Sequence, residues 1–440
     1  MSTAADTHRE IPFNYTSADD RLLVLQLLGE RVWEQLEALR GRRVTGRSAR
    51  LLQRVFGEVF IHRRNPFLFQ ELVYSLARRR RFFGNLAKDL AVVEQGAGEP
   101  LVHEVLSATR ALVADLERRT ARAPAERQRI LAALGPVVGR ENVLFDPFTL
   151  VSHATDATDW RLHLPVAVAM PTAEAQVAPL LAAIGSLGLS AIPRGAGTGL
   201  TGGAVPLRPD CVVVNTEKLN RILAVEERDF PAAGARASVM RLEAGVITER
   251  AMEEAARRGL VFATDPTSSW ACTIGGNVAE NAGGKMAVLW GTCIDNLVSW
   301  SMAMPSGATW TVRRTGHRLR KILPGDEVAW QVEDAGGRPV RTISLRGSEI
   351  RRNGLWKDIT NKALGGLPGV QKEGTDGVIT SAEFVLYRQY ESTATLCLEF
   401  FGPDMEEASE VVLALSGAFP AAGAGQEALQ ALEHFDDEYV

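Results

Sequence analysis

The sequence predicts an α+β protein in which an all-helical N-terminal region precedes a region of mixed helices and strands. Three observations support this fold class. Residues 17–134 place apolar side chains at helical spacing and show no strand-like alternation. Near Gly135 the apolar segments become shorter and β-branched. A glycine-rich stretch at 195–203, with five glycines in nine residues, lies between two strand-like segments.

The composition is ordinary for a globular protein and excludes few functions. The chain has 440 residues, 46% of them hydrophobic and 23% charged, which is enough for two or three domains. A net charge of −4 gives no global reason to expect nucleic acid as a partner. The four cysteines are scattered without a Cys-x-x-Cys pair, so we expect no metal site. With no secretory signal in residues 1–20 and no transmembrane segment, we expect a cytoplasmic protein.

The N-terminal region begins with a polar arm at 1–16 and continues as helices. Ser17 is the predicted N-cap of the first helix, whose apolar stripe runs to Leu39 and is interrupted by Gly29. Further helices are predicted at about 48–59, 66–90 and 101–119.

Two features of the N-terminal region can be interpreted either structurally or functionally. The arginine run at 78–81 is more typical of a solvated helix face than of a surface for nucleic acid or an anionic membrane. His62 has no metal partner at ligand spacing and is interpreted as a structural histidine.

The mixed region alternates short strands with helices. The predicted elements are a strand at 165–171, a helix at 172–187 with Thr172 as N-cap, strands at 189–193 and 211–215, a strand that ends at 241–246, and a helix at 248–258 that Gly259 terminates. The glycine-rich stretch connects two strands and does not open a helix. A nicotinamide-binding Rossmann fingerprint requires a helix there, so that interpretation is disfavoured.

The glycine-rich stretch has two interpretations on its residues alone. Successive backbone N–H groups without neighbouring Cβ atoms can cradle a phosphate. A flexible surface turn has the same composition. A second dense motif at 265–284 contains two Gly-Gly pairs and two asparagines, which could satisfy a polar, planar ligand at close range.

Four blocks in this order resemble the PCMH-type FAD-binding family of vanillyl-alcohol oxidase and p-cresol methylhydroxylase, in its branch of FAD-linked D-2-hydroxy-acid dehydrogenases. The blocks are Pro-Arg-Gly-Ala-Gly-Thr-Gly-Leu-Thr-Gly-Gly at 193–203; Asp-Pro-Thr-Ser at 265–268 with Ile-Gly-Gly-Asn at 274–277 and Asn-Ala-Gly-Gly at 281–284; Trp-Gly-Thr at 290–292; and Glu-Gly-Thr-Asp-Gly-Val-Ile-Thr at 373–380. The family usually has Tyr at 290, Leu at 376 and Ile at 378. The resemblance covers about residues 140–390 and favours the phosphate cradle over the turn.

The resemblance implies a set of FAD-binding residues. The diphosphate loop would comprise Arg194, Gly195, Ala196, Gly197, Thr198, Gly199 and Leu200, with a structural ion pair as the alternative role of Arg194. Pro266, Thr267 and Ser268 would line the flavin; Gly275, Gly276, Asn277, Asn281 and Gly283 would approach the flavin chain and diphosphate; Ile379 would line the adenine side. Relatives with covalent flavin commonly carry a histidine near position 198, so Thr198 implies non-covalent FAD.

The resemblance also implies a domain organisation. It gives a helical region at 1–134, which is similar, through residues 9–17, to an extension of some large bacterial members. A FAD-binding domain follows at 135–389, with subdomains at about 135–217 and 218–389, and then the start of an α+β cap at 390–440. In the cap we expect a strand at 392–401, a helix at 404–415 and a further element at 428–435. Residues 313–370 depart from the family pattern and are expected to form extra hairpins or loops.

The implied function is oxidation of a D-2-hydroxy acid such as D-lactate, glycolate or D-2-hydroxyglutarate. Electrons would pass from FAD to a separate quinone, cytochrome or iron–sulfur acceptor, which leaves peripheral membrane association open. The catalytic base is unknown, and His317, a lone loop histidine, is interpreted as non-catalytic. Because the family's substrate-binding cap residues are missing, we expect slow turnover by residues 1–440 alone. The alternatives are a non-catalytic FAD-binding or assembly module and a flavoenzyme of the same fold with another substrate.

Overall fold

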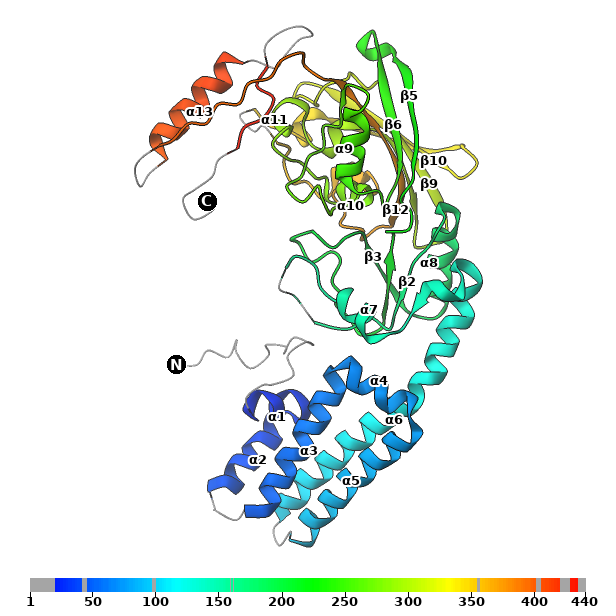
Figure 1. The fold of residues 1–440 in the computed structure, drawn as a ribbon, viewed down its shortest axis with the longest axis vertical. Coiled ribbons are helices and arrows are strands. Elements are labelled where there is room, and N and C mark those ends of the chain that lie inside the picture. Colours follow the sequence, from blue (N-terminus) through cyan, green and yellow to red (C-terminus); the bar gives the residue numbers. More distant parts are fainter. Residues whose placement is uncertain are drawn as a thin grey trace. The chain divides into compact units, whose positions relative to one another are not determined.

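The computed structural model describes residues 20–41, 46–96, 100–158, 160, 162–353, 357–400, 405–419 and 428–433. The chain divides into two compact units, which are considered separately (Figure 1). Unit 1 comprises Met1–Ala169, Leu187–Ile192 and Ala204–Val213, and unit 2 comprises Met170–Ser186, Pro193–Gly203 and Val214–Val440. The predicted cap of the first helix, Ser17, and the segment 9–17 lie outside the described residues.

Unit 1 is built mainly from helices that bury one apolar face each. They are α1 (Asp20–Leu28), α2 (Glu30–Gly41), α3 (Gly46–Arg64), α4 (Pro66–Tyr74), α5 (Leu76–Gln95) and α6 (Pro100–Val138). Their core includes Val55, Leu86 and Leu116, all almost completely buried. The predicted all-helical N-terminal region is thus confirmed.

Two predicted helix boundaries in unit 1 were wrong. The helix predicted over 66–90 is broken at Ser75, whose extended backbone ends α4 and whose hydroxyl accepts a hydrogen bond from the Arg78 N–H at 3.2 Å. A serine can cap a new helix in this way because its side-chain oxygen replaces a missing backbone partner. The helix predicted over 101–119 continues as α6 to Val138, through Pro124 and past the composition change at Gly135.

A four-stranded sheet follows the helices, with strand order β1-β2-β4-β3. Its strands are β1 (Val143–Leu144), β2 (Ala167–Ala169), β3 (Ser190–Arg194) and β4 (Cys211–Asn215), and α7 (Pro147–Ser152) lies between β1 and β2 in the chain. The short turn η3 (Glu174–Gln176) and α8 (Val177–Ser186) replace the predicted helix 172–187. Thr172 does not cap this helix, because the Gln176 side chain accepts from the Thr172 and Ala173 N–H groups instead.

Unit 2 is organised by a seven-stranded antiparallel sheet with strand order β11-β10-β9-β8-β12-β6-β5. The strands are β5 (Ile222–Phe230), β6 (Ala235–Glu243), β8 (Leu297–Ala303), β9 (Thr309–Thr315), β10 (Glu327–Asp334), β11 (Pro339–Arg346) and β12 (Val378–Val385). A separate pair joins β7 (Leu260–Val261) to β13 (Tyr387–Arg388). Helices α9 (Thr248–Ala256) and α10 (Ile274–Glu280) pack on the sheet through a core that contains Trp300, Trp330 and Met240 (Figure 1).

The remaining expectations for unit 2 had mixed outcomes. Within 313–370 the chain forms β10 and β11, a hairpin that widens the main sheet, together with the turns η5 (Gly347–Glu349) and η6 (Leu364–Gly366). The helix predicted at 404–415 is α13 (Glu406–Ala418). The strand predicted over 392–401 was wrong for its described residues, because 392–400 pair with no strand. Residues 428–433 are also irregular, and 434–435 are outside the described part.

No helix in the described part of the chain combines the length and the apolar character needed to cross a membrane. The short helices α11 (Ala287–Trp290) and α12 (Cys293–Asn296) complete unit 2 and join the 265–284 segment to β8. Two of the four sequence blocks that carried the family resemblance, 265–284 and 290–292, therefore lie between α9 and β8, whereas the block 373–380 leads into β12.

Candidate functional site

The glycine-rich loop, defined here as residues 195–203, leaves the end of β3 and meets two other segments of unit 2. A Cβ atom on Gly195 would lie only 2.2 Å from Thr273 Oγ1, at the start of α10. A Cβ on Gly203 would lie 3.2 Å from Glu373 Cβ. The structure therefore brings together the loop, the start of α10 and the turn before β12, which come from three sequence blocks far apart in the chain.

Gly195 is required by this close approach. No side chain can be accommodated between the loop backbone and the Thr273 hydroxyl without moving one of them. The carbonyl of Arg194, just before the loop, accepts a hydrogen bond from the Thr216 N–H at 2.9 Å, which fixes the point at which the loop begins.

The Arg194 side chain lies against the loop that follows it. Gly197 has a φ of +71°, and a Cβ there would lie 2.3 Å from a guanidinium nitrogen of Arg194. Arg194 is 9% exposed, so its positive charge is held close beside the loop backbone. A buried cation next to a run of backbone amides is a favourable arrangement for an anion.

Thr273 is a polar residue of this site that the sequence analysis missed. It precedes α10 in the N-cap position, yet its side chain makes no capping bond. Its Oγ1 is buried and has no hydrogen-bond partner among the described residues. Leaving a buried hydroxyl unpaired costs about 1–3 kcal/mol. The available signal was a threonine directly before an apolar helix that begins Ile-Gly-Gly, since threonine is a common N-cap residue.

Two carboxylates border the loop. Glu280, at the end of α10, accepts a hydrogen bond from Thr201 Oγ1 at 3.4 Å. Glu373 forms an ion pair with Lys362, and its N–H donates to the Ala279 carbonyl at 3.0 Å. Lys362 thus offsets the charge of Glu373, and Glu280 lies beside Thr201 at this edge of the loop.

The residues of the second block differ in what they contact. The Gly275 N–H donates to the Ala244 carbonyl at 2.7 Å, and a Cβ on Gly275 would lie 2.8 Å from Ala244 Cβ. Asn277 is buried, and its Nδ2 donates to Thr248 Oγ1 at 2.7 Å. We therefore assign Gly275 and Asn277 to the framework that holds α10 on the sheet, whereas Gly276 stays partly exposed beside Thr273.

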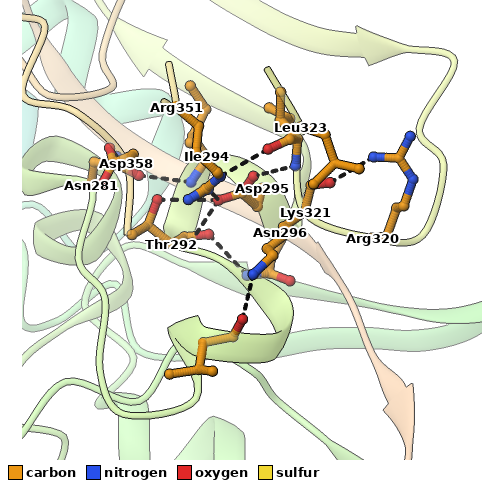
Figure 2. A network of polar contacts seen from close by, with 12 residues as sticks. Asn281, Thr292, Ile294, Asp295, Asn296, Arg320, Lys321, Leu323, Arg351 and Asp358 are labelled. Atoms are coloured by element: carbon orange, nitrogen blue, oxygen red, sulfur yellow. Dashed lines mark hydrogen bonds and ion pairs between the residues drawn. The ribbon is translucent and has the colours of Figure 1, made fainter. Parts of the chain in front are cut away.

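Asn281 also serves the framework. It ends α10 in the left-handed conformation (φ +54°), its Oδ1 accepts from the Ile294 N–H at 2.8 Å, and its Nδ2 donates to Asp358 (Figure 2). Both polar atoms of the side chain are thus engaged within the chain.

Gly283 and Ile379 lie in close-packed surroundings. A Cβ on Gly283 would lie 3.0 Å from Thr292 Cγ2. Ile379 is 5% exposed on β12, with its Cδ1 within 2.8 Å of the Cβ position of Gly369. The side chain of Ile379 thus belongs to the main core rather than to an open surface.

Residues 266–268 form a turn whose side chains remain accessible. The Pro266 carbonyl accepts from the Ser269 N–H at 2.8 Å, and Thr267 is exposed. Just before the turn, the buried carboxylate of Asp265 accepts from the Met286 N–H at 3.2 Å. Burial raises the pKa of Asp265 to about 6, and the bond from Met286 partly opposes this rise.

A buried ion pair supports the second sequence block, residues 265–284. Asp295, on α12, is fully buried, and its carboxylate binds Arg351 Nη2 at 2.6 Å (Figure 2). The same carboxylate accepts from the N–H groups of Thr292 (2.7 Å) and Ile322 (2.6 Å). The pair therefore joins α12 to the connection between β9 and β10 and to the segment after β11.

Asp358 is the second carboxylate of this network. It accepts from Asn281 Nδ2 and from Gln371 Nε2, the latter at 2.8 Å. Burial and the nearby negative charge of Asp295 raise the pKa of Asp358 to about 6, although Arg351 opposes this rise. Asp358 thus ties Asn281 to the segment that leads into the 373–380 turn.

The structure gives His317 a structural role, as the sequence indicated. It is 4% exposed, its Nδ1 accepts from the Leu319 N–H at 3.0 Å, and its Nε2 donates to the Asp295 carbonyl at 3.0 Å. Burial and Arg314 hold the pKa of His317 well below its usual value. The Nδ1 of His62 donates to the Glu58 carbonyl at 2.8 Å within α3. Among the described residues, no three His, Cys, Asp or Glu side chains gather in a metal-binding arrangement.

Comparison with known proteins assigns a class to the region that contains the loop. Residues 165–313 match a family described as FAD binding domain, and residues 6–118 match a family described as protein of unknown function (DUF3683). The resemblance seen in the sequence is therefore confirmed: the mixed region contains an FAD-binding domain, and its cofactor is FAD.

Three relatives show the extent of the similarity. The chain is 33% identical to the glycolate oxidase subunit GlcD of Escherichia coli K12 over 187 residues, covering 42% of this chain and 36% of that protein. It is 33% identical to D-lactate dehydrogenase of Anaerostipes hadrus over 141 residues, which cover 31% of this chain and 28% of that protein. It is 28% identical to mitochondrial D-2-hydroxyglutarate dehydrogenase of Arabidopsis thaliana over 197 residues, which cover 43% of this chain and 34% of that protein. The chain thus matches about a third of the length of these relatives.

The geometry of the site fits the diphosphate of FAD. No Cβ atom crowds the loop backbone at Gly195 and Gly197, the buried cation of Arg194 lies against it, and the Thr273 hydroxyl has no partner in the part of the chain that the structure describes. A diphosphate would supply an acceptor for the Thr273 hydroxyl and a negative charge beside the Arg194 guanidinium.

Replacing Arg351 by methionine should lower the free energy of unfolding by about 3–5 kcal/mol, because Asp295 would remain buried without its counter-charge. Urea unfolding measures this change. The matched control is Arg352→Met, at an exposed neighbouring position, with an expected change within about 0.5 kcal/mol. Equal effects of the two substitutions would contradict a stabilising role for the buried pair.

Asp358→Asn should change the pH dependence of stability. The pKa of Asp358 in the folded protein, about 6, lies above the ordinary value of about 3.9, so wild-type stability falls as the pH rises between these values. The variant avoids this loss and should be more stable than wild type by about 1–3 kcal/mol at pH 8, with no difference near pH 4. Unfolding curves at both pH values test this. Asp229→Asn, at an exposed position, is the control and should show no such difference.

Proposed function

We propose that this chain carries the FAD-binding part of an oxidoreductase that acts on a D-2-hydroxy acid such as D-lactate, glycolate or D-2-hydroxyglutarate. A hydride would pass from the substrate to non-covalent FAD, and the electrons would leave to a separate quinone, cytochrome or iron–sulfur acceptor. The names of the three relatives support the substrate class. The observation that carries the proposal is the meeting of the glycine-rich loop with Thr273 and the 373–380 turn.

The structure supports a revised set of residues around FAD. The diphosphate would be held by the loop backbone, by the side chains of Arg194 and Thr198, by the Thr273 hydroxyl and by Gly276. The accessible turn 266–268 would line the flavin. Gly275, Asn277, Asn281, Gly283 and Ile379 would act indirectly, by holding these segments in place.

The chemistry divides between FAD and the protein. FAD supplies the hydride acceptor when it is bound. Oxidation of a 2-hydroxy acid also needs a group that takes the hydroxyl proton and a cation that holds the carboxylate. We assign neither role to His317, because both of its ring nitrogens are engaged inside the protein.

Thr273→Val should weaken FAD binding without weakening the fold. The hydroxyl has no hydrogen-bond partner within the described ranges, so its loss should remove only a hydrogen bond to the cofactor, and the dissociation constant for FAD should rise about tenfold. Fluorescence titration of the apoprotein measures the constant, and thermal unfolding of the apoprotein should be unchanged or slightly improved. Thr273→Ser keeps the hydroxyl and should bind FAD as wild type does. Wild-type affinity in Thr273→Val would remove Thr273 from the site.

The substrate class is tested by anaerobic mixing of the FAD-loaded chain with D-lactate, glycolate and D-2-hydroxyglutarate. At least one should bleach the visible flavin band, because the oxidised flavin accepts the hydride, and the bleaching should be slow, in keeping with the slow turnover expected of residues 1–440 alone; L-lactate should not bleach the band. Dithionite, which reduces bound flavin chemically, serves as the positive control. An FAD-loaded protein that dithionite bleaches but none of the three acids does would favour the non-catalytic FAD-binding module.

A further inference from the structure

The helices of unit 1 expose a group of large apolar side chains at one place. Among the described residues 20–158, the exposed large apolar side chains are Phe67, Tyr74, Leu76, Val92 and Phe148. Four of these five lie on α4, at the start of α5 or on α7, which packs against α4. Phe67 and Tyr74 are 51% and 73% exposed and stand seven residues apart on α4, so they share one face of that helix.

Arginines surround this apolar group. The run at 78–81 lies in the first two turns of α5, two residues after Leu76. Arg78 forms an ion pair with Glu71, which lies on α4 between Phe67 and Tyr74. Arg79 donates to the Thr120 carbonyl of α6 at 3.0 Å, and further along α6 the guanidinium of Arg127 lies over the Tyr74 ring at 5.6 Å. Residues 118–127 of α6 therefore flank the junction of α4 and α5.

The local charge is strongly positive in a chain whose net charge is −4. Residues 66–84 carry four arginines and one acid, Glu71, whose charge Arg78 offsets. Residues 115–129 carry five arginines and three acids. Of these acids, Asp115 is near Arg63 and Arg118. The exposed arginines 80 and 81 extend the basic surface along α5.

We propose that this surface, composed of Phe67, Tyr74 and Leu76 with the arginine run 78–81, docks unit 1 on an anionic lipid bilayer. Isolated aromatic and aliphatic side chains that stand out beside guanidinium groups suit the headgroup region, where the apolar groups enter the lipid and the arginines meet phosphates. A solvated helix face explains the arginines but not the exposed apolar side chains beside them. The inference goes beyond the proposed oxidation and does not depend on it.

Co-sedimentation with lipid vesicles tests the proposal on the full chain. The protein should bind vesicles of phosphatidylglycerol and phosphatidylcholine, should not bind phosphatidylcholine alone, and should dissociate as salt is added. Arg80→Gln with Arg81→Gln should weaken binding about tenfold or more, because each arginine near an anionic surface contributes about fivefold. Phe67→Ser with Tyr74→Ser should also weaken vesicle binding, although the net charge of the protein is unchanged.

Matched variants control for net charge and for folding. Arg257→Gln with Arg258→Gln removes the same charge from the exposed end of α9 and should bind vesicles as wild type does. Val92→Ser removes an exposed apolar side chain of α5 outside the group, with the same expectation. Circular dichroism should show that all variants are folded.

Three results would overturn the proposal. They are failure of the wild type to bind anionic vesicles, equal losses in the two arginine pairs, and wild-type binding by Phe67→Ser with Tyr74→Ser. Binding to poly-glutamate but not to vesicles would point instead to an acidic protein partner.

Discussion

The candidate site depends on a close approach of backbone to side chain that only glycine permits. At Gly195 the loop lies directly on the Thr273 hydroxyl, with no space for a Cβ atom between them. This contact places the loop amides, the buried Arg194 cation and an unpaired hydroxyl at one end of α10. The Thr273 hydroxyl has no hydrogen-bond partner among the described residues, and a bound diphosphate would supply one beside the Arg194 cation.

The Asp295–Arg351 pair holds the framework behind this contact. Burying two charges is costly, and the cost is offset only because hydrogen bonds from Thr292 and Ile322 satisfy the carboxylate as well. Through Asp358 the network reaches Asn281, at the end of the helix that Thr273 begins. The charged and amide groups of this network therefore hold the segments that form the site. Gly195 then lets the loop pack closely on the start of α10.

Much of the fold could be predicted from local pattern. Helical periodicity gave the N-terminal helices, and short apolar runs gave β3 and β4, because these signals are local. The strand predicted over 392–401 failed because alternation does not provide a partner strand, and residues 392–400 have none. The break at Ser75 was missed because a capping serine within an apolar pattern resembles an ordinary helical position.

The site was predictable in its segments but not in the direction of its side chains. Glycine content and the family resemblance indicated the loop and the 265–284 segment. Asn277 and Asn281 were expected near FAD, yet their side chains bond to Thr248, Ile294 and Asp358, residues 13–77 positions away. Such pairings depend on how distant segments pack, which no local pattern contains. Thr273 was missed for the same reason. Its hydroxyl matters because it is buried without a hydrogen-bond partner among the described residues, and only the packing of distant segments shows this.

The most direct test of the central claim compares the binding of FAD and of riboflavin to the apoprotein by calorimetric titration. Riboflavin has the same ring system and ribityl chain but lacks both the diphosphate and the adenosine. If the loop, Arg194 and Thr273 hold the diphosphate, FAD should bind at least about 100-fold more tightly, which corresponds to two charge-assisted hydrogen bonds. Equal affinities would show that the loop does not bind the diphosphate and would contradict the account of the site.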